Sequence, residues 1–292
     1  APLLMEGLRR LEYRGYDSAG VATLLDGQVQ RRRCEGKLAE LGSLLKTDPI
    51  EGSIGIGHTR WATHGPASTV NAHPHSTDLV ALVHNGIIEN FLKLREELEG
   101  QEYRFKSETD TEVVLALIDG YLRKGMSPAE ATRTMLGRVE GAFALAIIFT
   151  GHDNLMIGAR RGCPLVVGHG NGQLFLGSDA LALVPLTRRI SYLEEGDWVE
   201  LQDNVVTVHN QAGEVANRPI REIDLADSAV EKGNHAHFML KEIYEQPVVI
   251  GDCLQSLFNP VKRTISLPQL NINLSDYERV SVVACGTSYY AG

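Results

Sequence analysis

The sequence is poor in cysteine, and the few cysteines it has are not spaced for cross-linking. The four are widely separated and form no C-x-x-C pair, which argues against a disulfide framework and against a zinc ribbon. Scattered thiols are typical of a reducing compartment, so we expect the chain in the cytoplasm. The cysteines are Cys34, Cys163, Cys253 and Cys285.

Long apolar runs and an excess of basic charge are also missing. No apolar stretch approaches the length of a membrane span and no charged-then-apolar leader opens the sequence, so we expect no membrane partner. Lys and Arg total 28 against 37 Asp and Glu, for a net charge of −9, so we expect no nucleic-acid partner. The composition, 43% hydrophobic and 22% charged over 292 residues, indicates a globular protein with a sizeable core.

The pattern of helix and strand signals changes near residue 142. Before it, helical patterns alternate with strands, and Asp26-Gly27 is a strong hairpin signal. After it, short strands with little helix between them indicate antiparallel pairing, so we expect an α+β fold with helices outside a sheet core. The expected helices cover 3–13, 37–46, 87–98, 109–123 and a segment from 127 onward, with capping boxes at 109–112 and 127–130. The expected strands cover 19–25, 28–33, 53–59, 78–83, 142–149, 155–160, 165–167, 173–177, 190–193, 197–202 and 205–209.

The C-terminal part predicts a linker and the start of a second domain. A polar stretch at 210–233 is followed by a helical pattern at 239–257. The apolar run 280–284 predicts a buried strand that leads into Cys285-Gly286-Thr287-Ser288, and such a turn presents a phosphate site in parallel α/β domains. We therefore expect a first domain at 1–205, a linker at 206–238 and the beginning of a second domain at 239–292.

Three stretches carry residues suited to binding an amino acid. Arg60, in a loop expected at Gly57–Gly65 together with Trp61, could clamp a carboxylate bidentately, although a surface cation–π pair is the alternative. Asn85-Gly86, expected at the end of a buried strand and just before a helix, offers two donors for an oxyanion hole, or forms an ordinary turn. Asp110, at a helix start, could bind an ammonium or simply favour the helix dipole, and the residues alone favour the latter.

Histidines are frequent near these stretches and raise the question of a metal. His73 and His75 lie close in sequence to His64 and His84, but no Cys or carboxylate accompanies them at ligand spacing. We therefore expect structural histidines and no metal.

Seven stretches of the sequence carry a resemblance to a known family: 13–20, 60–65, 71–75, 83–90, 107–112, 241–247 and 285–288. Together they resemble the glutamine–fructose-6-phosphate aminotransferase (isomerising) family, the amidotransferases of the glucosamine-6-phosphate synthase type. The resemblance implies an N-terminal-nucleophile (Ntn) amidohydrolase αββα sandwich followed by a sugar-isomerase domain, with glutamine and fructose 6-phosphate as substrates. It implies no cofactor, and a homodimer for the full-length protein.

The resemblance also implies roles for single residues. The Asn85 side chain and the Gly86 amide would hold the oxyanion, Arg60 the glutamine α-carboxylate and Asp110 its ammonium. Thr63 and His64 would shape the binding loop, and Trp61 would gate the passage of ammonia. Thr287 and Ser288 would contact the sugar phosphate.

The sequence departs from the family at its nucleophile. In the family an N-terminal cysteine within a Cys-Gly-Ile strand attacks glutamine, with its own α-amine as base, whereas position 1 here is Ala. We expect this stretch of chain to bind glutamine without hydrolysing it, either as part of a bifunctional synthase or as a non-catalytic glutamine-binding module. A purine or asparagine amidotransferase of the same fold is disfavoured by residues 241–247 and 285–288.

Overall fold

The chain divides into two compact units, residues 1–231 and 232–292. The structure, a computed structural model, describes residues 1–223 and, beyond them, 237, 239–244, 246–247, 250, 258–259, 264–265, 278–279, 281–284 and 289–290. Within this described part, no helix combines the length and the apolar character needed to cross a bilayer.

The first unit contains three antiparallel sheets. A three-stranded sheet has the order β2-β1-β3, a four-stranded sheet the order β14-β10-β8-β9, and a seven-stranded sheet the order β13-β12-β11-β7-β6-β5-β4. Their strands are β1 (Ser18–Leu25), β2 (Gln28–Glu35), β3 (Ile54–Arg60), β4 (His75–Ser76), β5 (Val80–Ile88), β6 (Gly141–Phe149), β7 (Leu155–Arg161), β8 (Val166–His169), β9 (Leu174–Gly177), β10 (Arg189–Tyr192), β11 (Trp198–Gln202), β12 (Val205–His209), β13 (Val215–Ala216) and β14 (Ile220–Glu222).

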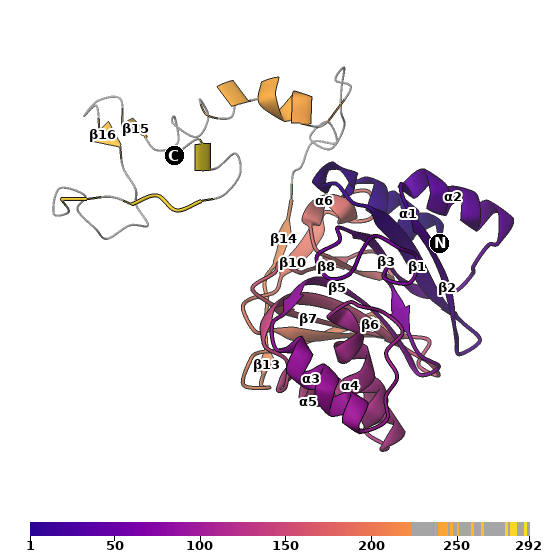
Figure 1. Cartoon of the computed structure of the whole chain (residues 1–292). Coiled ribbons are helices and arrows are strands. Elements are labelled where there is room, and N and C mark those ends of the chain that lie inside the picture. The colour runs from indigo at the N-terminus through magenta and orange to yellow at the C-terminus, as the bar shows by residue number, and fades with distance from the viewer. Residues whose placement is uncertain are drawn as a thin grey trace. The chain divides into compact units, whose positions relative to one another are not determined.

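Helices cover the sheets on two sides, which gives the unit four layers (Figure 1). Helices α3, α4 and α5 lie against the outer face of the seven-stranded sheet, and α1, α2 and α6 lie over the two smaller sheets. The six are α1 (Pro2–Arg9), α2 (Leu38–Thr47), α3 (Phe91–Gly100), α4 (Thr111–Arg123), α5 (Pro128–Leu136) and α6 (Ala180–Leu183). The expectation of an α+β core with helices outside is confirmed.

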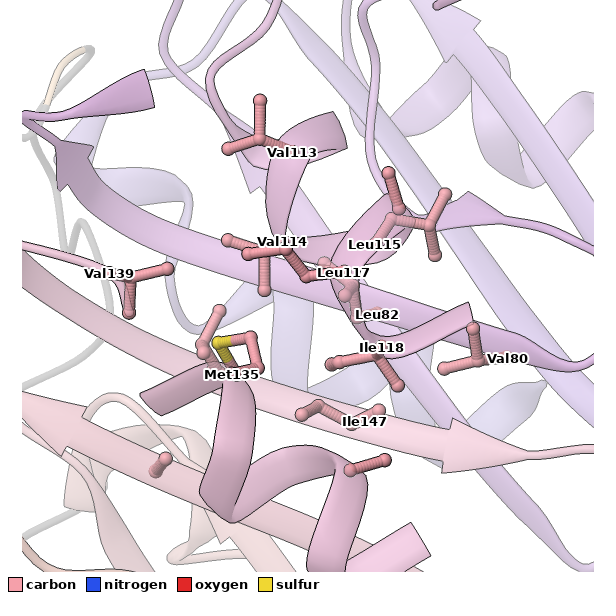
Figure 2. Close-up of a cluster of buried hydrophobic side chains, with 14 of the residues drawn as sticks. Val80, Leu82, Val113, Val114, Leu115, Leu117, Ile118, Met135, Val139 and Ile147 are labelled. Carbon is pink, nitrogen blue, oxygen red and sulfur yellow. The ribbon is translucent and has the colours of Figure 1, made fainter. Parts of the chain in front are cut away.

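The main core lies between the seven-stranded sheet and helices α3 to α5. Alternate residues of β5 face opposite sides: Val80 and Leu82 pack toward the helices, and Ala81 and Val83 toward the three-stranded sheet. Figure 2 shows Leu117 and Ile118 of α4 beside Leu82 and Ile147. The first nine residues of α4 are all buried, as in a helix covered on every side. This packing fixes the start of α4 against β5, where the candidate site lies.

Local signals account for several element boundaries. The β1–β2 hairpin turns at Asp26 and Gly27, whose φ angles of 51° and 71° suit a two-residue turn, as expected. The expected capping box of α5 is formed by Ser127 and Glu130. The helix expected at 3–13 is shorter, because α1 ends at Arg9 and a 3₁₀ turn follows at Glu12–Arg14.

The first unit extends further than the boundary expected at residue 205. Strand β12 crosses that position and pairs with β11, and β14 pairs with β10 in the four-stranded sheet. The polar composition of this stretch suggested a linker, but short edge strands exposed to solvent also have polar sequences. The expected linker at 206–238 is therefore wrong for residues up to Glu222.

In the second unit, the residues from Met239 to Tyr244 are helical, and β15 (Phe258–Asn259) pairs with β16 (Thr264–Ile265). Of the strand expected at 280–284, the described residues Ser281–Ala284 have no strand structure, and Val283 is 94% exposed. A strand needs a hydrogen-bonded neighbour, and in the described part of this unit β15 and β16 pair only with each other. The predicted phosphate turn, with Thr287 and Ser288, lies outside the described residues.

Candidate active site

A cavity of about 680 Å³ lies between the two smaller sheets. Strand β3 forms one wall and β9 the other, and both are edge strands of their sheets. Residues of β5 and β6 form the wall between them, while α1 and α6 contribute apolar side chains. Of the residues expected in a site, those that line this cavity are Arg60, Trp61, Thr63, Asn85, Gly86 and Asp110.

Arg60 is the last residue of β3, not part of a loop as expected, and only 4% of it is exposed. Its guanidinium donates hydrogen bonds to the backbone carbonyls of residues 64, 65 and 66, at 2.5, 3.2 and 3.2 Å. Burial lowers the pKa of Arg60, and the charges of Asp17 and Asp110 partly oppose this. Three of the five N–H donors of Arg60 are used in this way. The other two make no hydrogen bond to the residues that the structure describes, and so can serve a ligand.

The loop after Arg60 carries the other expected residues. Trp61 is 66% exposed, and its ring lies so close to Gly15 that a Cβ there would collide with it. Thr63 lines the cavity, whereas His64 does not. The His64 ring packs edge-on against Phe91, with 4.9 Å between centroids, and its Nδ1 lies 3.9 Å from Asp110 Oδ1. His64 therefore borders the site through Asp110 and does not form its surface.

Asn85 and Gly86 lie inside β5, not at the end of a strand directly before a helix. They pair with Ala144 and Phe143 of β6, and the helix begins only at Phe91. The helix expected from residue 87 is wrong there, because Ile87 and Ile88 continue the ladder with β6 and β-branched residues suit a strand. Gly86 has φ of 112°, and a Cβ at this position would collide with the carbonyl of Ala142. Only glycine fits this position.

Asp110 is the N-cap residue of α4, is 3% exposed, and accepts a hydrogen bond from the backbone N–H of Ile88. The capping box expected at 109–112 is not formed. The helix begins one residue too late for it, and the Glu112 carboxylate instead accepts from the backbone N–H groups of Lys106 and Ser107. The second carboxylate oxygen of Asp110, Oδ1, lies 3.9 Å from His64 Nδ1, and Asp110 lines the cavity.

Four buried histidines, His58, His73, His75 and His84, form a cluster beside the cavity. The His73 ring lies 4.5 Å from that of His58 and 4.8 Å from that of His75. Hydroxyl groups at the start of α4 bond the rings: Thr111 Oγ1 lies 2.9 Å from both His73 and His84. Burial lowers the pKa of all four, to about 4 for His58 and His84. In the described part of the chain, no group of three or more metal-binding side chains is arranged to hold an ion.

The structure adds two residues that received no role from the sequence. His58 lies two positions before Arg60 on the same strand, so the alternation of β3 could have placed it on the same face. Cys163 lines the cavity, and a Cβ on Gly86 would lie 3.0 Å from its Sγ. Nothing in the sequence signals this contact, because it joins β5 to a loop far along the chain.

The arrangement suits a zwitterionic ligand with a polar side chain. A buried guanidinium and a buried carboxylate, Arg60 and Asp110, can hold a carboxylate and an ammonium. Asn85 and Gly86 line the same cavity and can present N–H donors to a third group.

Comparison with known proteins agrees with this geometry. The family model described as glutamine amidotransferase domain matches residues 18–229. Over 289 residues the chain is 56% identical to a protein of Zymomonas mobilis named glutamine–fructose-6-phosphate aminotransferase (isomerizing), covering 99% of this chain and 48% of that protein. A protein of the same name from Gluconobacter oxydans is 49% identical and is also covered to 48%. The chain thus spans about half the length of the curated relatives it matches.

Solved structures share the fold of the first unit. The glutamine phosphoribosylpyrophosphate amidotransferase of B. subtilis, complexed with ADP and GMP, superposes with a TM-score of 0.63 at 25% identity, covering 73% of this chain and 47% of that one. The allosteric regulatory enzyme of purine biosynthesis gives a TM-score of 0.61 at 27% identity, covering 72% and 46%. The Ntn-type αββα fold expected for the first unit is confirmed. The chain belongs to the glutamine amidotransferase domain family.

Proposed function

We propose that this chain is the glutamine-hydrolysing part of an enzyme that passes the released ammonia to fructose 6-phosphate and forms glucosamine 6-phosphate. The observation that carries the proposal is the meeting of Arg60, Asp110 and Asn85-Gly86 around one cavity. The names of the relatives that match nearly all of the chain support the acceptor sugar.

In this proposal glutamine lies with its two ends held separately. An N–H group of Arg60 that the loop carbonyls leave unused binds the α-carboxylate, and Asp110 Oδ1 binds the ammonium. Burial strengthens both interactions, because both side chains are almost completely removed from water. The side-chain amide then lies toward Asn85 and Gly86.

The attack itself needs a thiol with a neighbouring base. We propose that an extended segment carrying an N-terminal cysteine occupies the cavity between β3 and β9, where two strand edges face the same space. Its α-amine takes the thiol proton as the sulfur attacks the amide carbon, and then gives that proton to the amide nitrogen, which leaves as ammonia. Water then hydrolyses the thioester, which releases glutamate and restores the thiol. The Asn85 amide and the Gly86 N–H stabilise the oxyanion of each tetrahedral intermediate.

The remaining proposals concern the whole protein. Trp61, exposed at the cavity, gates the passage of ammonia, while Thr63 and His64 shape the binding loop. Thr287 and Ser288 contact the phosphate of the sugar. The full-length protein acts as a homodimer in the cytoplasm, without nucleic acid or membrane as partners, and sedimentation at several concentrations tests the dimer.

The proposal is tested by measuring binding and hydrolysis on matched chains. Calorimetry on residues 1–292 should detect glutamine binding, which Arg60→Ala abolishes. The same chain preceded by a Cys-Gly-Ile strand should release ammonia from glutamine, and the matched chain with Ser in place of that Cys should bind glutamine without releasing ammonia. A well-folded extended chain that binds glutamine but leaves it intact would favour a non-catalytic binding module.

A further inference from the structure

His58 is joined to Asn85 by a hydrogen bond between side chains, with 2.8 Å between His58 Nε2 and Asn85 Oδ1. The two residues come from different sheets, His58 from β3 and Asn85 from β5. No role for His58 follows from the function proposed above. Its partner, however, is the side chain to which that function assigns the oxyanion.

The strand geometry brings His58 to the site. Ile56, His58 and Arg60 alternate with more exposed residues along β3 and are all buried, so they share one face of the strand. This face lines the cavity, and His58 itself is 8% exposed. The same strand therefore carries both the candidate carboxylate ligand and the partner of Asn85.

The position of the ring proton follows from the environment of His58. Burial lowers the pKa of His58 to about 4, so the imidazole is neutral at pH 7. Hydrogen bonds to the Asn85 side chain and to the His84 backbone oppose this shift, whereas the charges of His84 and Arg60 add to it. A neutral imidazole carries one proton, and a carbonyl oxygen can only accept. The bond to Asn85 Oδ1 therefore requires the proton on Nε2.

The opposite orientation of the Asn85 amide is less favourable. With the amide turned round, its NH₂ group would donate to Nε2, and the ring proton would move to Nδ1. His58 Nδ1 is buried, and no hydrogen bond of ordinary geometry reaches it among the residues that the structure describes, although the backbone of His84 lies near the ring and favours its charged form. A buried N–H without an acceptor is costly, whereas the observed orientation leaves only a lone pair unpartnered.

We propose that His58 is a positioning residue for the oxyanion hole: by donating from Nε2 to Asn85 Oδ1, it fixes the Asn85 amide so that its NH₂ group is available to the substrate. The planar amide makes this possible, because holding the oxygen determines the direction of the nitrogen. The inference rests on the proposed function for its kinetic consequence, but not for the orientation of the pair.

The orientation is tested on this chain without any activity. In ¹⁵N NMR spectra at neutral pH, His58 should be the Nε2–H tautomer, identified by the coupling pattern of its ring protons. The Asn85 NH₂ signals should shift in His58→Leu and return toward their original positions in His58→Gln, whose amide nitrogen can replace Nε2 as donor. Finding His58 as the Nδ1–H tautomer would overturn the proposal.

The kinetic consequence is tested on the chain preceded by the Cys-Gly-Ile strand. His58→Leu should lower kcat for glutamine hydrolysis about 10- to 100-fold with little change in KM, because a misdirected donor affects mainly the transition state. His58→Gln should recover most of the lost rate. On an Asn85→Ala background, His58→Leu should cause no further loss.

The outcomes separate the two proposals. If the unsubstituted extended chain does not hydrolyse glutamine, the proposed function fails, while the NMR result still decides the orientation of the pair. If it does hydrolyse glutamine and His58→Leu, still folded, keeps full kcat, the positioning role is refuted. Equal losses in the Asn85→Ala and unsubstituted backgrounds would also refute it, since His58 would then act independently of Asn85.

Discussion

The carboxylate of Asp110 accepts a hydrogen bond from the backbone N–H of Ile88, with 2.8 Å between Oδ2 and N. This contact joins the start of α4 to the end of β5, two residues beyond Gly86. One oxygen of Asp110 is thus used to hold the strand that carries Asn85 and Gly86. The same side chain both positions the site and supplies its negative charge.

Substitutions at Asp110 should separate these two contributions. Asp110→Asn keeps an oxygen that can accept from Ile88 but loses the charge, so we expect stability close to wild type and glutamine binding weaker by about 10- to 100-fold. Asp110→Ala also leaves the Ile88 N–H without its acceptor and should lower the free energy of unfolding by about 1–3 kcal/mol. Calorimetry and urea denaturation measure the two effects. Unchanged glutamine binding in Asp110→Asn would remove the ammonium-binding role.

Gly86→Ala should destabilise the first unit strongly. The added Cβ meets the Ala142 carbonyl at φ of 112°, and we expect a loss of about 2–4 kcal/mol in the free energy of unfolding. The matched control is Gly120→Ala within α4, where a Cβ meets no atom within 4 Å. That variant should gain about 0.5–1 kcal/mol through helix propensity. Urea denaturation of both variants measures their free energies of unfolding, and equal values for the two would contradict the prediction.

Alkylation of Cys163 should prevent glutamine from binding. The thiol is free, half-buried and lines the cavity next to Gly86, so an added maleimide group would occupy the ligand space. The reaction should be slow, because burial raises the pKa of the Cys163 thiol. Cys163→Ser should bind glutamine and resist the reagent, whereas Cys34→Ser should stay sensitive. If mass spectrometry shows that Cys163 is modified and the modified protein still binds glutamine, this prediction is contradicted.

The histidine cluster should make the first unit sensitive to mild acid. Burial holds the folded-state pKa of each ring below its usual value of about 6.5, reaching about 4 for His58 and His84. Between these values the unfolded chain binds more protons, so the stability present above about pH 6.5 is lost as the pH falls toward 4. Each ring contributes a slope of about 1.4 kcal/mol per pH unit in the steep part of this window.

Urea denaturation across this pH range measures the slope. Replacing one ring of the cluster, as in His75→Gln, should reduce the slope, since one fewer proton is taken up on unfolding. The control is Val205→Thr, at an exposed position that carries no titratable group, which should leave the slope unchanged. A similar slope in all three proteins would show that other groups cause the acid sensitivity.

The sequence by itself determined the family, most of the elements and several residues of the candidate site. Hydrophobic periodicity and turn residues such as Asp26-Gly27 act locally, so the hairpin, the α5 cap and the short strands after residue 142 were predictable. The end of strand β5 and the expected capping box at 109–112 were predicted wrongly, because contacts with distant parts of the chain decide them. Pairing with β6 keeps Ile87 and Ile88 extended, and the packing of α4 determines the residue at which this helix begins. Neither effect is local in sequence.

Only the tertiary structure decided how the site residues are oriented. The bonds of Asp110 to Ile88 and of His58 to Asn85 join residues 22 and 27 positions apart, and Cys163 reaches Gly86 from a different part of the chain. Such contacts depend on how separate sheets pack, which periodicity does not report. Sequence patterns could therefore name Arg60, Asn85, Gly86 and Asp110, whereas the hydrogen bonds that aim their side chains follow from packing between the layers.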